Sequence, residues 1–261
     1  MPELPDVEIA RRDLQSWLVG AKVSAALCMD ARLTRPRLPR AFARALIGRT
    51  VDAVARKGKW LRFILDDGNR VFSHLGMTGS WVQVAMGAPS RRSERARIDV
   101  VGRGRAFSVR YVDARRFGRL IVARRDIADW TALGPDPLAD GIDIGRLSET
   151  FAKSRRAVKV VLMDQRVLAG IGNIIATEAL WIARLDPRSP CVALLPPDAR
   201  AIVRGLDQII ARELADPADS FLVYGKAGKH CPRCGTRLSS VVLGGRTTVY
   251  CAGCQLRRKT T

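Results

Sequence analysis

Pro2 and Glu3 stand side by side at the start of the chain and could carry covalent chemistry. Met before a small residue such as Pro is normally removed, which would leave Pro2 with a free secondary amine. An α-amino group titrates about two pKa units below a lysine, so a fair fraction is neutral and nucleophilic at physiological pH. Such an amine can attack a sugar C1′ and form an iminium, while the Glu3 carboxyl moves protons. The alternative is a chance Met-Pro start, which many chains have.

Two Cys-x2-Cys pairs have the spacing of a zinc site. The pairs are Cys231 with Cys234 and Cys251 with Cys254, and sixteen residues separate them. Each pair offers two thiolates to one side of an ion, and two pairs complete a tetrahedron. Four cysteine ligands leave no position for water, so we expect one structural Zn²⁺. Chance pairs or two disulfides are the alternatives. The remaining two cysteines, Cys28 and Cys191, are expected to be ordinary buried thiols.

Gly170-Ile171-Gly172-Asn173 comes just before an apolar stretch, residues 174–185, that is expected to be helical. Glycines let backbone N–H groups approach a phosphate, and a helix N-terminus favours an anion. Asn173 is expected to cap this helix and to donate to the same phosphate. A plain glycine turn is the alternative.

The net charge of the chain points to a polyanionic partner. Its 261 residues include 45 Lys and Arg against 25 Asp and Glu, which gives +20. Nucleic acid is the first candidate and an anionic membrane surface the second. Charge that only serves solubility, or the arginine usage of a GC-rich genome, would give the same count.

No targeting segment is evident in the sequence. The first six residues lack a basic region followed by an apolar run, and no stretch approaches the roughly 18–20 apolar residues of a membrane span. No basic amphipathic helix favours a membrane surface. We therefore expect a cytoplasmic protein, associated with the nucleoid if its source is bacterial, in reducing conditions that keep cysteines free.

Local patterns divide the chain into a β-rich part and a helical part. A first amphipathic helix is expected over residues 5–19, with Pro5 in its first turn. Short β runs separated by turn residues then suggest a sandwich or barrel. The expected strands are 22–27, 50–55, 60–65, 70–74, 81–84, 98–101, 106–111 and 120–123, and the later helices are 145–154, 156–164, 174–184 and 197–214.

Seven segments, in order, resemble the formamidopyrimidine-DNA glycosylase/endonuclease VIII family. The opening Met1–Glu8 looks like the family's N-terminus. The others are Gly58–Leu61, similar to its catalytic-lysine hairpin; His74–Ser80 and Asp113–Gly118, similar to its void-filling loops; Leu133–Leu138, its interdomain segment; 162–174, its helix–two-turn–helix; and the zinc hairpin.

The resemblance implies an α+β multidomain fold: an N-terminal helix with a β-sandwich, a helical domain with the helix–two-turn–helix, and a C-terminal zinc-finger β-hairpin. The implied bounds are 1–130 for the catalytic domain, 131–141 for the linker, 142–225 for the helical domain and 226–261 for the zinc finger. The implied partner is double-stranded DNA with a damaged base or an abasic site, bound by a monomer without a membrane.

The implied activity is that of a bifunctional DNA glycosylase and abasic-site lyase of base-excision repair. Pro2 would attack C1′, the base would leave, and β,δ-elimination from the Schiff base would cut the strand. Glu3 would be the general acid/base. Lys59 would act at the phosphate and sugar; the Gly-Lys-aromatic-Leu pattern selects it over Lys57, which strand alternation cannot separate from it.

A flipped base leaves a hole in the duplex that apolar side chains can fill. By resemblance Met77, Arg115 and Phe117 fill that hole. Without the resemblance, Met and Phe would be ordinary core residues and Arg an ordinary surface residue. The remaining implied DNA contacts are Arg97, Arg155, Asn173 and Arg246. Arg155 and Lys159 fall where the family carries basic residues near the lesion backbone, and a solvated helix face is the alternative for both. For Arg246 the alternative is a solvated hairpin tip.

The chief departure from the family is a missing loop. Formamidopyrimidine-DNA glycosylases carry a long Gly/Ser-rich loop that closes over 8-oxoguanine, where this chain has only Ala215–Ser220. The sequence therefore predicts a preference for formamidopyrimidine, hydantoin or abasic sites over 8-oxoguanine. Two rival interpretations are an endonuclease VIII-like glycosylase for oxidised pyrimidines and a non-catalytic protein that binds damaged DNA.

Overall fold

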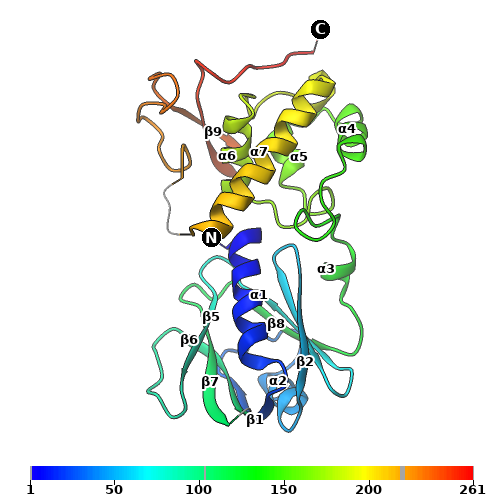
Figure 1. The fold of residues 1–261 in the computed structure, drawn as a ribbon, viewed down its shortest axis with the longest axis vertical. Helices are drawn as coiled ribbons and strands as arrows, with labels where there is room; N and C mark the ends of the chain where they lie inside the picture. The colour runs from blue at the N-terminus through cyan, green and yellow to red at the C-terminus, as the bar shows by residue number, and fades with distance from the viewer. Residues whose placement is uncertain (1, 103, 218–220, 261) are drawn as a thin grey trace. The chain divides into compact units, whose positions relative to one another are not determined.

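The computed structural model describes residues 2–102, 104–217 and 221–260, which form two compact units (Figure 1). The first unit contains Pro2 and Asp6–Ala132. The second contains Glu3–Pro5 and the described residues from Leu133 onward. Three residues close to the start of the chain thus belong to the second unit, between Pro2 and the rest of the first unit.

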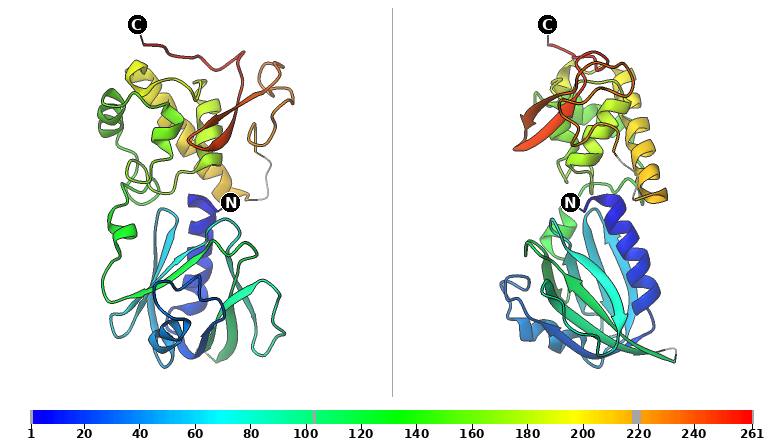
Figure 2. Two further views of the ribbon diagram at one scale, coloured as in Figure 1. Left: turned by 180° about the vertical axis from the view of Figure 1, so that it is seen from behind. Right: turned by 90° about the vertical axis from the view of Figure 1, so that its left-hand side faces the viewer.

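Two four-stranded antiparallel sheets and all but the first two residues of helix α1 (Leu4–Leu18) make up most of the first unit (Figure 2). One sheet has the order β1-β6-β7-β5 and the other the order β2-β3-β4-β8. The strands are β1 (Lys22–Cys28), β2 (Val51–Lys57), β3 (Trp60–Leu65), β4 (Arg70–His74), β5 (Ser80–Ala85), β6 (Glu94–Gly102), β7 (Arg105–Val112) and β8 (Arg119–Ala123).

Apolar side chains from both sheets and from α1 share one core, which confirms the β-sandwich. Leu14 and Leu18 of α1 are fully buried in it. Along β6 every second side chain is buried, including Ile98 and Val100, as expected for a strand with one face on a core. The core therefore fixes which strand faces are left at the surface.

The sequence prediction missed helix α2 (Pro39–Leu46), which lies in a region expected to contain only strands. Pro39 occupies its first turn, where a missing N–H costs nothing. Phe42 and Leu46, four residues apart, are its only buried side chains. With two apolar positions the helical period was too short to stand out from the arginines around it.

The second unit packs its helices around a separate core. Its longer helices are α4 (Ile144–Ala152), α6 (Asn173–Ile182) and α7 (Pro196–Ala215), and its shorter ones α5 (Val158–Leu162) and the 3₁₀ turn Cys191–Ala193; α3 (Ala128–Thr131) ends the first unit. Helix α6 is buried over almost its whole length. The lone cysteines Cys28 and Cys191 are both buried and free, as expected.

The β-hairpin of the second unit has a small core of its own. Strands β9 (Ser239–Leu243) and β10 (Arg246–Tyr250) pair in register, and Val249 packs with Trp181 of α6. Among the described residues no helix is both long and apolar enough to cross a membrane.

A buried ion pair lies in the first unit between β6 and β7. Arg110 Nη1 is 3.1 Å from Glu94 Oε2, and both side chains are 1% exposed. The same guanidinium donates to the carbonyl oxygens of Ala88 and Pro89. It therefore ties the loop before β6 to the sheet.

Arg110→Met should lower the free energy of unfolding by about 3–5 kcal/mol, because it leaves the Glu94 carboxylate buried without its cation. The double variant Arg110→Met/Glu94→Gln should recover part of that loss. Chemical denaturation of the three proteins measures both effects, and a single variant as stable as the double would contradict the argument.

Candidate active site and zinc centre

The Glu3 carboxylate lies at the N-terminus of helix α6. Oε1 accepts the N–H of Ile174 at 2.9 Å and Oε2 that of Ile175 at 3.0 Å. Glu3 is 2% exposed. Four backbone N–H groups at a helix start lack intrahelical partners, and the helix dipole favours an anion there. The carboxylate therefore holds the chain beside α6, and Pro2 is the residue directly before it.

Gly170 makes room for this N-terminal segment. Leu4 N–H donates to the Gly170 carbonyl at 3.2 Å. A Cβ on Gly170 would come within 2.6 Å of Leu4 Cδ1, and its φ of +92° also favours glycine. The glycine turn thus serves the packing of Leu4, and two N–H groups of α6, those of Ile174 and Ile175, bind Glu3.

Asn173 does not cap α6, contrary to the expectation. It is the first residue of the helix and makes no capping bond with its side chain. Its Oδ1 accepts from Lys159 Nζ, and its Nδ2 donates to the Thr247 carbonyl at 3.2 Å. The expectation failed because a carboxylate from another part of the chain occupies the helix start.

Lys159 is fully buried, so the solvated alternative for it is wrong. Its Nζ donates to Asn173 and, at 2.6 Å, to Thr248 Oγ1, and so joins α5 and α6 to β10. Desolvation lowers the pKa of Lys159 to about 8; the Arg246 charge acts in the same direction, and Glu3 opposes both. Exposed Arg246 is on the same strand as Thr248. Lys159 therefore brings Glu3, Asn173 and the Arg246 strand into one site.

Asp113 organises two loops of the first unit. Fully buried, it accepts hydrogen bonds from Thr78 Oγ1 at 2.6 Å, from Arg115 N–H at 3.1 Å and from Gly118 N–H at 2.8 Å. A Cβ on Gly76 would lie 2.5 Å from the Phe117 backbone. The loops His74–Ser80 and Asp113–Gly118 are thus built against each other.

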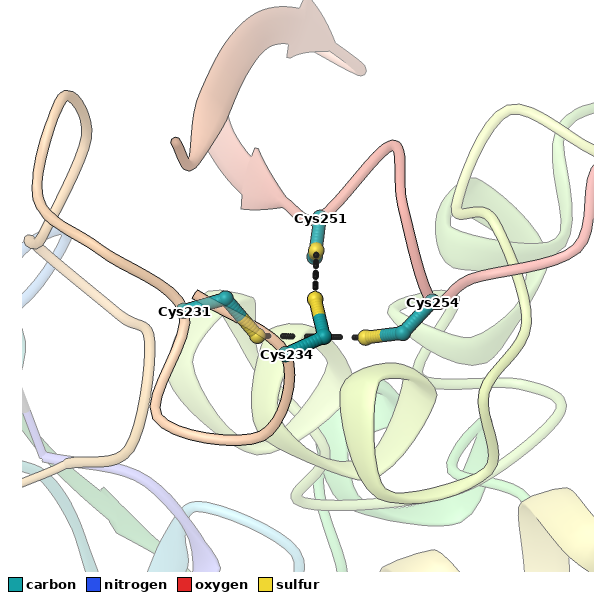
Figure 3. A group of neighbouring side chains, drawn as sticks. All are labelled: Cys231, Cys234, Cys251 and Cys254. Atoms are coloured by element: carbon teal, nitrogen blue, oxygen red, sulfur yellow. Dashed lines mark hydrogen bonds between the residues drawn. The ribbon is translucent and has the colours of Figure 1, made fainter. Parts of the chain in front are cut away.

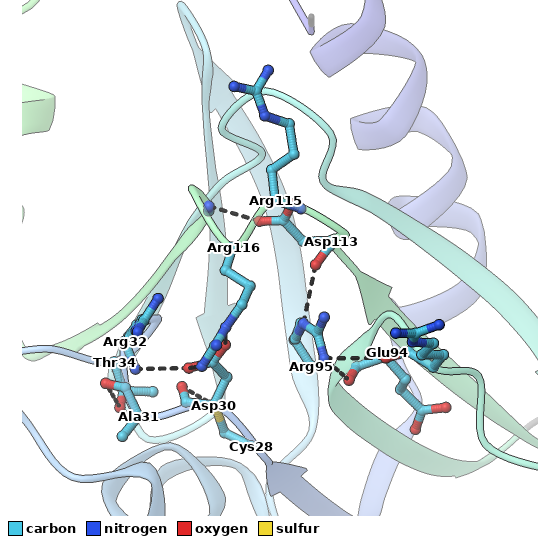
Figure 4. Close-up of polar contacts among 12 residues, drawn as sticks. Cys28, Asp30, Ala31, Arg32, Thr34, Glu94, Arg95, Asp113, Arg115 and Arg116 are labelled. Atoms are coloured by element: carbon cyan, nitrogen blue, oxygen red, sulfur yellow. Dashed lines mark hydrogen bonds and ion pairs between the residues drawn. The ribbon is translucent and has the colours of Figure 1, made fainter.

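Arg116 holds the second loop from its other side. It pairs with Asp30, which is 4% exposed, and has a φ of 62° (Figure 4). Arg115 points away from this pair, and its guanidinium lies 5.1 Å from the centre of the Phe117 ring. Phe117 is 55% exposed, so the core alternative for it is wrong; Met77 is half-buried. An exposed aromatic ring on an anchored loop is suited to contact a partner.

Lys59 lies in the turn Gly58-Lys59 of the β2–β3 hairpin, whereas Lys57 is in β2 opposite Trp60. Strand alternation, which could not separate the two lysines, does not apply to a turn residue. Burial lowers the pKa of His74 to about 4, and the charge of Lys59 contributes to this shift. Lys59 is therefore near the start of the His74–Ser80 loop.

Arg97 and Arg155 are the two remaining expected DNA contacts. Arg97 is in β6, opposite Leu27 and Arg110, with its Nε 3.5 Å from Asp99 Oδ2. Arg155 is exposed in the loop between α4 and α5, so a helix face is the wrong description of its position.

Glu178 is a buried residue that the sequence analysis missed. Its carboxylate accepts the N–H groups of Leu222, Val223 and Tyr224 at 2.8, 2.9 and 2.6 Å. It fixes the chain just after the shortened segment Ala215–Ser220, of which residues 218–220 lie outside the described residues. A single acidic residue in a mostly apolar helix was the signal that could have revealed it.

The four paired cysteines converge on one point (Figure 3). Their Sγ atoms all lie within 4.8 Å of one another, with Cys231–Cys254 at 3.8 Å and Cys234–Cys251 at 3.4 Å. Tetrahedral zinc with bonds of about 2.3 Å places its sulfurs about 3.8 Å apart. All four are free thiols, which excludes the disulfide alternative here and fits one structural zinc.

Cys231→Ser should abolish stoichiometric zinc, which metal analysis of the unchanged protein should find at about one ion per chain. The hairpin should loosen, and Trp181 fluorescence should report it because Trp181 Nε1 donates to Cys231 Sγ at 3.4 Å. Cys191→Ser is the matched control and should keep zinc. A zinc-free protein with an unchanged hairpin would refute the site.

Lys159 should make stability depend on pH. Its folded pKa of about 8 is below the ordinary 10.5, so the unfolded chain binds the proton more tightly between those values. The free energy of unfolding should therefore rise with pH from about 8 to 10.5, by up to about 3 kcal/mol from this group. Subtracting the profile of Lys159→Met isolates the term, and a difference that falls with pH would contradict it.

Comparison with known proteins identifies the family. The chain matches models of the formamidopyrimidine-DNA glycosylase N-terminal domain over residues 1–120, of its H2TH domain over 133–221, and of the zinc finger found in FPG and IleRS over 228–257. It is 35% identical to formamidopyrimidine-DNA glycosylase of Stutzerimonas stutzeri, with 98% of this chain and all of that protein covered. The Thermomicrobium roseum protein is 36% identical, with 98% and 99% covered.

Solved structures agree with this assignment. Formamidopyrimidine-DNA glycosylase of Lactococcus lactis bound to DNA with an abasic site has a TM-score of 0.89 and 27% identity, over 98% of this chain and all of that one. The same protein bound to Fapy-dG DNA has a TM-score of 0.88, 27% identity and the same coverage. The chain therefore belongs to the formamidopyrimidine-DNA glycosylase family, with its helix–two-turn–helix domain and its zinc finger.

Proposed function

We propose that Pro2 is the nucleophile of this base-excision repair enzyme, a DNA glycosylase with abasic-site lyase activity. The observation that carries the proposal is the Glu3 carboxylate bound to two N–H groups of α6. These bonds fix Glu3, the residue next to Pro2, in a buried position where its negative charge acts on Lys159. A nucleophile of this kind needs to be held in place, because orientation contributes a large part of covalent catalysis.

The proposed reaction starts with attack of the Pro2 nitrogen on the sugar C1′. The bond between C1′ and the base breaks, and the base leaves with a proton. The Pro2 nitrogen, having lost its proton, then opens the sugar ring: the C1′–O4′ bond breaks, O4′ takes up a proton, and an iminium forms at C1′. The iminium acidifies C2′, so loss of a proton there expels the 3′ phosphate, and δ-elimination then expels the 5′ phosphate. Glu3 is the proposed proton carrier, and Lys59 the cation at the phosphate and sugar.

The proposed partner is double-stranded DNA with a damaged base or an abasic site. Phe117 and Met77 would fill the space of the flipped base, and Arg115 would face the orphaned base with its forked donors. Arg97, Arg155 and Arg246 would bind phosphates. Asn173, whose amide bonds to Lys159 and Thr247, would act mainly by fixing the strand of Arg246.

We further propose a monomer that acts in the cytoplasm, on the nucleoid if the source is bacterial, where reducing conditions preserve the zinc thiolates. The domain bounds 1–130, 142–225 and 226–261, with a linker at 131–141, remain part of this proposal.

Sodium borohydride should trap a covalent adduct between this protein and abasic-site DNA. Pro2→Gly, or an N-terminal extension that is not removed, should reduce trapping at least about a hundredfold, because the nucleophilic amine is altered or blocked. Lys59→Met should slow strand cutting, and Lys57→Met in the same hairpin is its matched control. Undiminished trapping with a blocked N-terminus would assign the chemistry to a lysine.

The lesion that the enzyme prefers follows from the shortened segment Ala215–Ser220. Planar 8-oxoguanine differs from guanine by little more than a carbonyl and an N7 hydrogen, so its recognition depends on a few hydrogen bonds. The family's long loop, which would supply them, is absent from this sequence. An endonuclease VIII-like preference for oxidised pyrimidines is the second candidate, and the same short segment favours it.

Single-turnover excision should be at least about tenfold faster for formamidopyrimidine and hydantoin lesions than for 8-oxoguanine, because they disturb stacking more and need less loop contact. Abasic sites should also be cut efficiently, and C should be the favoured opposite base. Arg115→Ala should remove that opposite-base preference for every lesion alike. Equal rates for 8-oxoguanine opposite C and the hydantoins would show that the missing loop does not set specificity.

A further inference from the structure

A groove of about 610 Å³ lies on the first unit between helix α2, the β3–β4 turn at Asn69 and the end of β8. Four exposed arginines border it, namely Arg37, Arg40, Arg44 and Arg124. Its other lining is mainly apolar, including Leu38, which is 55% exposed, and Val122. The groove thus combines a cationic border with an apolar floor.

Among the described residues, the border arginines lack the carboxylate partners that neighbouring arginines have. Over the part of the chain that the structure describes, none of the four forms an ion pair, and no Asp or Glu lines the groove. By contrast, Arg62 and Arg70 of the adjoining sheet share Asp126. Arg40 and Arg44 are one helical turn apart on α2, where like charges repel. An anionic ligand would relieve that repulsion.

We propose that this groove binds an acidic segment of a partner protein that also carries apolar side chains. Carboxylates would pair with the border arginines, and an apolar side chain would cover Leu38 and the floor. A DNA backbone would satisfy the arginines but would gain nothing from the floor. The chain's own C-terminal residues Arg257, Arg258 and Lys259 are basic and do not suit the groove.

The groove lies at the end of its sheet opposite Lys59. In β4, Arg70 pairs with Ala123 at the groove end and His74 pairs with Arg119 at the other. Four strand steps separate the ends, which is about 13 Å. A peptide in the groove would therefore leave the β2–β3 turn and the His74–Ser80 loop uncovered.

Fluorescence anisotropy with the full-length protein tests the proposal, using a labelled peptide in which Asp alternates with Phe. Arg40→Glu/Arg44→Glu should weaken binding at least about tenfold, since it reverses two of the four charges. Arg200→Glu/Arg204→Glu, an exposed pair with the same spacing on α7, changes the net charge equally and should change binding less than about twofold. Leu38→Ser should also weaken binding of the peptide, because it removes an apolar contact. In a purely ionic site this substitution would leave binding unchanged.

A second variant guards against loss of fold. Arg37→Gln/Arg124→Gln should weaken the peptide in the same direction, and both groove variants should cut abasic-site DNA at nearly the unchanged rate. The proposal is overturned if the α7 pair weakens the peptide as much, if an Asp-Gly peptide binds as well as the Asp-Phe one, or if a single-stranded oligonucleotide binds the groove more tightly than the peptide.

Discussion

The capping of α6 by the Glu3 carboxylate is the contact on which the rest of the candidate site depends. A buried carboxylate is costly unless it is bonded, and a buried helix start is costly unless its N–H groups are satisfied. Here the two N–H groups of the helix start donate to the buried carboxylate at 2.9 and 3.0 Å, so both are satisfied at once. The packing of Leu4 against Gly170 completes this attachment. The first residues therefore form part of the helical unit, although the sheets that follow them in sequence do not.

A second buried charge, that of Lys159, connects the helices to the zinc hairpin. Lys159 is buried between Asn173 and Thr248, with its charge balanced by Glu3 and opposed by Arg246. Because a half-satisfied buried cation would be strongly destabilising, the helices and β10 have to hold their positions together. Zinc fixes the far end of the hairpin through four thiolates. Arg246 is thus presented on a strand that is held at Thr247 and Thr248 and by the zinc cysteines that follow it.

Local patterns predicted most of the fold but few of the contacts that build the site. Helix ends expected from apolar period and turn residues agree with those observed to within two residues, because burial on one face imposes that period. The zinc site could be predicted because the spacing of two Cys-x2-Cys pairs is by itself typical of four zinc ligands. Asn173 as a helix cap was wrong, and Glu178 was missed, because both outcomes depend on segments distant in sequence. A carboxylate 171 residues away leaves no periodic trace at the helix that it caps.

The placement of carboxylates beside particular arginines says more about binding than the net charge of the chain does. With 45 Lys and Arg against 25 Asp and Glu, many cations cannot find a carboxylate in the same chain. Arg116 forms an ion pair with Asp30 and shapes a loop. Arg115, next to it, points away from that pair and lies over the Phe117 ring. Identical side chains one residue apart thus have opposite uses, and only the placement of the acids distinguishes them. Selection for binding an anion would act on those acids as much as on the arginines, because a single carboxylate placed within reach would neutralise the site.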